Sequence, residues 1–245
     1  MKERPILFSG PMVLAILEGR KSQTRRVLKP QPPTGEWDVG RLHAEEIFPT
    51  VIDRNGDEQP GTECFGATCD SGEWCLRCPY GAPGDLLWVR ETWFSPPRPL
   101  DDLLGFAADG DHPHGVTYRK RPSIHMPRWA SRLTLRITSV HVERLQEISE
   151  EDAVAEGCKE YVDRWWQGLV RLPDGGRSMS EGGADPDGPP PAEYEHPEIQ
   201  EYRRPAKQEF CALWNSINAK RASWSSNPWV WVISFERVEQ QRVAA

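Results

Sequence analysis

A strand-like alternation in residues 133–145 constrains the fold of this chain more than any other feature. Apolar residues occupy every second position, the phase slips near 138–139, and the alternation then resumes: Leu133, Leu135 and Ile137, then Val140, Val142 and Leu145. A period of two is typical of a strand with one buried face. A slip of one residue indicates a bulge, which is common where a barrel strand curves. We therefore expect a long curved strand at the centre of a β-rich fold.

The remaining elements follow from shorter patterns. Strands are predicted at residues 4–8, 86–93, 116–120 and 229–235, and helices after Gly10, Ser149 and Pro205. Ser149 with Asp152 three residues later resembles a capping box, and the helix that it starts is expected to end at Gly157. Several strands with three helices, but without regular βαβ alternation, favour a mixed β-barrel with peripheral helices.

Two long insertions interrupt this pattern within a single predicted domain of residues 1–245. Residues 30–80 are rich in Pro, Gly and acidic residues and contain four of the six cysteines. Residues 160–204 include the stretch DGGRSMSEGGADPDGPPPAEYEHPE, which has almost no apolar side chains. Such a composition cannot bury enough apolar surface to offset the entropy of ordering. We expect an irregular first insertion and a flexible acidic second one.

The charge and the hydropathy exclude some classes of protein. The formal net charge is -7, which disfavours a protein that coats nucleic acid through a basic surface but allows a local basic cleft or an uncharged nucleoside substrate. No run approaches the roughly 20 apolar residues of a membrane span. The first ten residues, MKERPILFSG, lack the apolar core of a secretory signal. We expect a cytoplasmic protein without a membrane partner; its oligomeric state is left open.

Residues 19–26, GRKSQTRR, hold three Arg and one Lys in eight positions. Gly19 is expected to end the preceding helix. If the segment formed a helical turn, Lys21 and Thr24 would share a face, since residues three apart are neighbours there. A desolvated Lys beside a hydroxyl can accept its proton. The alternative is a solvated basic turn whose cations stabilise the C-terminus of the helix.

The run Gly19-x-Lys21-x-x-Thr24-x-Arg26 resembles the signature of the ASCH family, G-x-K-x-x-[ET]-x-R. Other segments are similar, in the same order, to larger ASCH-domain proteins of phages and prophages. They are PILFSGPMVLAILEGRKSQTRR, PYGAPGDLLWVRETW, RPSIHMPRWASRLTLRIT and NPWVWVISFERV. The resemblance implies a PUA-like β-barrel.

The Thr form of this signature resembles small bacterial ASCH proteins that are N4-acetylcytidine amidohydrolases, in which a Lys, a Thr and a Glu form the catalytic set. The resemblance implies that Lys21 and Thr24 are catalytic. It also implies that Glu156 is the catalytic Glu, because residues 153–156 match the A-x-x-E pattern in which that Glu occurs. Thr24, or a water that it holds, would attack the amide. Lys21 would act as base or stabilise the oxyanion, and Glu156 would relay protons, without a cofactor.

A second group of residues is predicted to bind the substrate. In the loop of residues 121–132, Trp129 can stack on a base, and His125 or Arg128 can contact its edge or a phosphate. The alternative is a structural loop with Trp129 packed on the mouth of the barrel. The predicted set is completed by Arg26, Glu91 and Trp93, with core packing as the alternative for Glu91 and Trp93.

Four cysteines in the first insertion have the spacing C-x4-C-x5-C-x2-C: Cys64, Cys69, Cys75 and Cys78. Four thiolates suit a tetrahedral zinc ion, and a CxxC pair readily supplies two of them. The two interpretations are a structural zinc site and a set of reduced thiols.

The sequence thus leads to a hypothesis with two alternatives. The first hypothesis is a hydrolase that removes an acyl group from a modified cytidine or a related nucleoside base. One alternative is a non-catalytic ASCH module that binds RNA, single-stranded DNA or a modified base. The other is a ribonuclease, an activity reported for some ASCH proteins.

Overall fold

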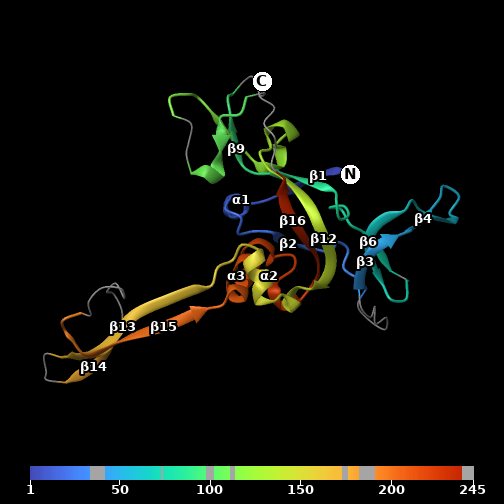
Figure 1. Ribbon diagram of the computed structural model, residues 1–245. Coiled ribbons are helices and arrows are strands. Elements are labelled where there is room, and N and C mark those ends of the chain that lie inside the picture. The colour runs from blue at the N-terminus through green and yellow to red at the C-terminus, as the bar shows by residue number, and fades with distance from the viewer. Residues whose placement is uncertain are drawn as a thin grey trace.

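The computed structural model describes residues 1–33, 42–72, 74–97, 102–110, 114–172, 176–181 and 191–238. Its centre is a five-stranded sheet (Figure 1). The strands, in spatial order, are β1 (Glu3–Leu7), β8 (Leu86–Arg90), β12 (Thr134–Arg144), β16 (Trp229–Val238) and β2 (Gln23–Val27). The β1–β8 pair is parallel and the other pairs are antiparallel.

The long strand β12 forms as its alternation predicts. Its register against β16 shifts between Ile137 and Ser139, which confirms the irregularity expected at that point. The apolar residues on both sides of the shift, Leu135, Ile137, Val140 and Val142, are buried in the main core. The shift therefore keeps one face of a strongly curved strand apolar along its length.

The described strands form an open sheet, so the expectation of a closed barrel is corrected. β1 and β2 are the edges of the five-stranded sheet, and no pairing joins them within the described part of the chain. The chain is nonetheless mostly β-sheet, with three α-helices in its described residues. Local alternation identifies strands, but closure depends on which distant strands pair, and that information is not local.

The three helices are α1 (Gly10–Leu17), α2 (Glu150–Ala155) and α3 (Ala206–Asn218). The Ser149 hydroxyl accepts a hydrogen bond from the Asp152 N–H, as the capping pattern predicts. α2 and α3 pack together over a second apolar cluster, which includes Leu145, Phe210, Trp214 and Val232. Short 3-10 helices cover Ala107–Asp109, Ser123–His125, Arg128–Ala130, Leu145–Glu147 and Trp224–Ser226.

The first insertion is more regular than expected. It contains a three-stranded sheet of β3 (Leu42–Ile47), β6 (Cys64–Cys69) and β7 (Cys75–Arg77), and a hairpin of β4 (Thr50–Ile52) and β5 (Glu58–Pro60). Side chains of the three-stranded sheet, including Leu42 and Ala67, join the main core. The sheet is therefore part of the packed body rather than an irregular loop.

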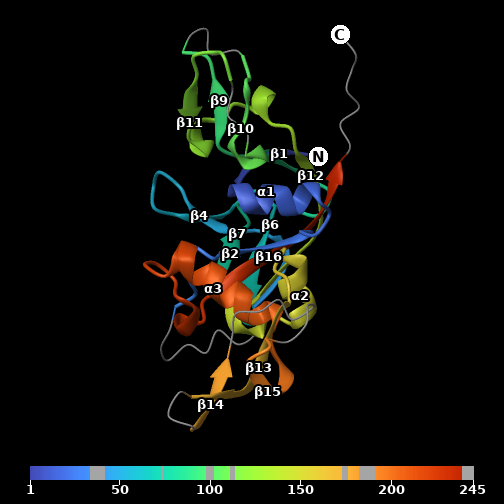
Figure 2. The ribbon, with the colours of Figure 1, turned by 90° about the vertical axis from the view of Figure 1, so that its left-hand side faces the viewer.

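The second insertion also differs from the flexible loop that was expected. Its described residues form β13 (Tyr161–Arg171), β14 (Arg177–Glu181) and β15 (Tyr194–Arg204), in the spatial order β14-β13-β15. These strands project from the body as a long arm (Figures 1 and 2). Residues 173–175 and 182–190 of the predicted loop lie outside the described residues.

A small sheet lies at the end of the molecule opposite the arm (Figure 2). It consists of β10 (Gly105–Phe106), β9 (Trp93–Ser95) and β11 (Arg119–Arg121). Its own apolar cluster is made of Trp93, Phe106, Met126 and Ala130. Among the described residues, no helix has the length and apolar character needed to cross a membrane.

Candidate functional site

The segment GRKSQTRR is a turn followed by a strand. Gly19 has a φ of +74°, and the N–H groups of Arg20 and Lys21 both bond to the Ala15 carbonyl. Lys21 then forms an isolated antiparallel bridge with Glu156, and β2 begins at Gln23. The helical turn on which Lys21 and Thr24 would share a face is therefore wrong. The turn delivers Lys21 to the end of α2, where Lys21 is bonded to Glu156, and Thr24 follows in β2.

Lys21 and Glu156 form a buried ion pair. The Lys21 Nζ lies 2.7 Å from the Glu156 Oε2 and 2.8 Å from the Glu156 carbonyl oxygen. The two side chains are 0% and 3% exposed. Burial lowers the pKa of Lys21 below its usual range, although the adjacent carboxylate opposes that shift. The charge of Glu156 adds to the effect of burial at Cys158, and the pKa of that thiol is raised to about 11.

Gly157 allows the two loops to approach each other this closely. Its φ is +94°, and a Cβ at this position would lie 3.2 Å from the Ala15 Cβ and 3.3 Å from the Lys21 Cβ. Such contacts are tighter than most real Cβ contacts. The left-handed backbone and the missing side chain at Gly157 therefore let the end of α2 fit against the end of α1.

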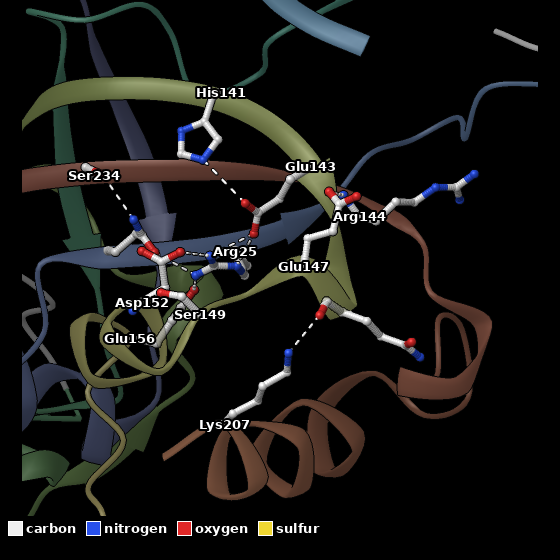
Figure 3. A network of polar contacts seen from close by, with 12 residues as sticks. Arg25, His141, Glu143, Arg144, Glu147, Ser149, Asp152, Glu156, Lys207 and Ser234 are labelled. Carbon is white, nitrogen blue, oxygen red and sulfur yellow. Dashed lines mark hydrogen bonds and ion pairs between the residues drawn. The ribbon is translucent and has the colours of Figure 1, made fainter. Parts of the chain in front are cut away.

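Arg25 connects Glu156 to a wider polar network (Figure 3). Its Nε donates to Glu143 at 2.8 Å and its Nη2 donates to Asp152 at 2.9 Å. Its Nη1 donates to the Gln23 side chain at 2.6 Å and lies 3.5 Å from the Glu156 Oε1. The Arg25 side chain is 0% exposed. Glu156 is thus held by Lys21 at one carboxylate oxygen and by Arg25 at the other.

Thr24 and Glu156 line one cavity of about 70 Å³, together with Arg26 and residues of α1 and α3. Within the described part of the chain, the Thr24 hydroxyl has no hydrogen-bond partner. Arg26 stacks on the Phe8 ring, 5.1 Å from its centroid, and donates to the Leu7 carbonyl. Its Nε has no partner among the described residues. The cavity therefore holds a hydroxyl, a carboxylate and a guanidinium with unused donors.

A hydroxyl, a carboxylate and a guanidinium in one cavity can together catalyse acyl transfer. A carboxylate can take a proton from a hydroxyl or a water, and a fixed guanidinium can stabilise an oxyanion. Lys21 does not line the cavity, because its ammonium is enclosed by Glu156. The geometry favours Lys21 as the group that holds Glu156, rather than as a group that touches a substrate.

The predicted substrate-binding residues do not gather at this cavity. Arg26 lines it, but five do not: Glu91, Trp93, His125, Arg128 and Trp129. Those five belong to the β9–β11 end of the molecule. Trp129 is 53% exposed and lies edge-on against the buried Trp93, with ring centroids 5.9 Å apart. His125 is exposed, and Arg128 pairs with Glu3 at 2.9 Å.

Glu91 is buried in an ion pair with Arg132 and is not open to a substrate. It is 1% exposed and accepts two hydrogen bonds from Arg132, at 2.8 Å and 2.9 Å. The Arg132 guanidinium also pairs with Asp109 and stacks on Phe106, 4.0 Å from the ring centroid. Burial raises the pKa of Glu91, although Arg132 opposes the shift. This clamp joins the small sheet to β12.

The four clustered cysteines are not brought together. Cys64 and Cys69 are the first and last residues of β6, and a strand rises roughly 3.3 Å per residue, so they lie far apart. Cys69 is buried and contacts Ser71 and the Trp74 N–H. In the described chain no three His, Cys, Asp or Glu residues are grouped to hold a metal ion. The arrangement does not fit one tetrahedral zinc bound by all four thiolates, and the zinc site stays a prediction without structural support.

Two residues of the site were not identified from the sequence. Arg25 is the centre of the polar network, and Phe8 supports both Arg26 and Lys21, whose Nζ lies 5.7 Å from the ring centroid. The strand alternation of β2 was the available signal for Arg25, because it places Gln23 and Arg25 on the same face. Nothing local identifies Phe8, which reaches the site from the end of β1.

The assignment to the ASCH family rests on the sequence segments alone. Glu156 shares a cavity with Thr24 and is bonded to Lys21, but this arrangement does not by itself show the family. A scan against protein-family models finds no match to this chain, and searches of curated proteins and of solved structures find none.

Proposed function

We propose that this chain is an ASCH-type hydrolase that removes an acyl group from a modified cytidine or a related nucleoside base. The observation that carries the proposal is the convergence of Thr24, Glu156 and Arg26 on one cavity, with Lys21 bonded behind Glu156. Lys21 and Glu156 are 135 positions apart in the sequence, so the fold has to bring them together.

The reaction follows from the positions of the groups. Glu156 accepts the proton of a water, or of the Thr24 hydroxyl, and the oxygen attacks the carbonyl carbon of the N-acyl group. Arg26 stabilises the negative charge on the tetrahedral oxygen. Glu156 then delivers the proton to the leaving nitrogen as the C–N bond breaks. The products are a carboxylate and the free exocyclic amine; if Thr24 itself attacks, a water hydrolyses its ester in a second step.

The size of the cavity limits what enters it. A volume of about 70 Å³ suits an acyl group, whereas sites for whole drug-sized ligands enclose roughly 300–1,000 Å³. The acyl amide would therefore enter the cavity while the base and sugar lie at its mouth. Met12, Phe210 and Trp214, which also line the cavity, would contact the apolar part of the acyl group.

Incubation with N4-acetylcytidine, with cytidine measured by chromatography, tests the proposal. Thr24→Val removes the hydroxyl and keeps the side-chain volume, so we expect kcat/KM to fall about 100-fold or more, within the range for one catalytic group. Thr24→Ser keeps the hydroxyl and is expected to retain activity. Absence of turnover by the wild-type protein, or equal activity in both variants, would contradict the proposal.

A second candidate function, binding of single-stranded nucleic acid without catalysis, is favoured by Trp129. Its ring is 53% exposed and lies against Trp93 of β9, the strand that pairs with the exposed cations Arg119 and Lys120 of β11. Exposed aromatic rings near cations are typical of stacking platforms. Titration of oligonucleotides at two salt concentrations, with Trp129→Ala as the variant, distinguishes this function. An unchanged affinity in the variant would exclude Trp129 as the platform.

A further inference from the structure

Two further cavities lie next to the cavity at Thr24. A second cavity of about 540 Å³ shares Val27, Ile217 and Asn218 with it. A third cavity, of about 300 Å³, shares Val27, Arg221 and Ala222 with the second. The three cavities are therefore neighbours, and each shares lining residues with the next. We call the second and third cavities together the α3 groove, because they follow the C-terminal end of α3 beside β2.

The α3 groove is positively charged. Its lining contains four cationic side chains and, among the described residues, no Asp or Glu: Lys29, Arg144, Lys220 and Arg221. The chain as a whole has a formal net charge of -7. A concentration of cations in one concave surface of an acidic protein creates a local field that attracts anions.

The two arginines of the groove retain unused donors. Arg144 stacks on Trp229, 4.6 Å from the ring centroid, and donates to the Asn227 carbonyl at 3.1 Å. Arg221 is exposed. Among the described residues, the Arg144 guanidinium therefore bonds to a backbone carbonyl rather than to a carboxylate. Arginine presents a planar fork of N–H groups that matches a phosphate, so these residues suit a phosphate better than a neutral group.

We propose that the α3 groove binds a phosphate group of the substrate, so that the preferred substrate is a nucleotide or a strand end rather than a free nucleoside. The inference rests on the proposed function for the position of the acyl group, which Thr24 and Glu156 receive. The base and sugar extend from that cavity past Val27, and the phosphate reaches Arg221 and Arg144. The α3 groove also supplies the volume that the cavity at Thr24 lacks.

Binding measured by calorimetry with unacylated ligands tests the phosphate site without any need for catalysis. Cytidine and cytidine 5′-monophosphate differ only in the phosphate. A charge-assisted hydrogen bond contributes enough for the monophosphate to bind about 10- to 100-fold more tightly, and added salt should reduce the difference. Equal affinity for the two ligands would overturn the proposal.

Arg221→Gln locates the effect, because this side chain is exposed and its replacement leaves the core intact. The preference for the monophosphate should fall to near unity in this variant, with the affinity for cytidine unchanged. Arg54→Gln, a change at an exposed residue of the β4–β5 hairpin, should keep the full preference. A second outcome would also overturn the proposal. If Arg221 only stabilises the C-terminus of α3, the melting temperature falls and the preference for the monophosphate persists.

A short oligocytidylate distinguishes the two sources of phosphate. Tighter binding than the monophosphate assigns the groove to a strand, and equal binding assigns it to a mononucleotide; both outcomes support a phosphate site. Failure of the two proposals is separable. If the protein does not hydrolyse N4-acetylcytidine but prefers the monophosphate, the hydrolase proposal is wrong and the phosphate site in the α3 groove is supported. If the protein hydrolyses N4-acetylcytidine but does not prefer the monophosphate, only the proposed phosphate site is wrong.

Discussion

The ion pair between Lys21 and Glu156 is costly to place where it is. Both groups lose nearly all contact with water, and the mutual attraction of a buried pair does little more than offset that desolvation. Arg25 adds a third buried charge to the same carboxylate. Packing alone would be served as well by apolar residues, so the arrangement fits a role in positioning Glu156 beside Thr24.

For these two side chains, removal of both partners should be less damaging than the two single removals added together. Lys21→Met and Glu156→Gln each leave an unpaired buried group, so each should lower the free energy of unfolding by about 3–5 kcal/mol. The double variant should cost less than the sum of the two. Urea denaturation of the four proteins measures the coupling.

Arg136→Gln provides the control, since it removes an exposed ion pair with Glu236 and should change stability by about 0–1 kcal/mol. Strictly additive effects of Lys21→Met and Glu156→Gln would show that the two side chains do not interact. Lys21 could then not be the residue that positions Glu156.

Among the elements, the site depends on how two helices end. α1 ends in a turn at Gly19, α2 ends before Gly157, and the bridge between Lys21 and Glu156 joins the two ends. The Ser22 N–H also donates to the Ala155 carbonyl at 2.9 Å. These backbone contacts tie the segment that carries Lys21 to the end of α2.

Gly157→Ala should therefore disturb both stability and the site. The left-handed backbone disfavours any Cβ by about 1–2 kcal/mol, and the contacts with Ala15 and Lys21 add to that cost. Gly84→Ala is the matched control, because Gly84 has a φ of +90° and a Cβ at that position would meet nothing within 4 Å. Thermal melts of both variants separate backbone strain from crowding. An equal loss of stability in the two would show that the loops are not tightly packed at Gly157.

For the whole molecule, the arm of β13, β14 and β15 is separate from the core. Its strands pair with one another, and none of its described residues belongs to the apolar clusters of the body. Tyr161 pairs with Arg204, so the two ends of the arm meet at its base. The body and the candidate site are built without it.

Replacement of residues 161–204 by a short Gly/Ser linker should leave the body folded. The ion pairs lost at the base, Arg203 with Glu160 and Arg204 with Glu209, are exposed or partly exposed. The expected change is therefore about 0–1 kcal/mol, or a shift in melting temperature of at most about 4 °C. Circular dichroism melting measures it. Deletion of residues 42–78, which removes the core residues Leu42 and Ala67, should abolish cooperative unfolding. Loss of cooperativity in the arm deletion as well would show that the arm contributes to the core.

Elements with a local signal could be predicted from the amino-acid order alone. The alternation around Ile137 predicted β12 and its irregularity, Ser149 predicted the start of α2, and Pro205 predicted the start of α3. The strands β14 and β15 escaped prediction because their sequences, RSMSE and YEHPEIQEYRR, are mostly polar. Their order comes from backbone pairing and from cross-strand ion pairs such as Arg171 with Glu195.

Which of these elements lie together was settled by the three-dimensional fold. The fold left the sheet open, separated Trp93 and Trp129 from the cavity that Arg26 lines, and placed Cys64 and Cys69 at opposite ends of one strand. The motif indicated Lys21 and Thr24, but the turn at Gly19 and the end of α2 brought Glu156 to them. Contacts between segments this distant depend on long-range strand pairing and on core packing, neither of which is encoded in any local stretch of sequence.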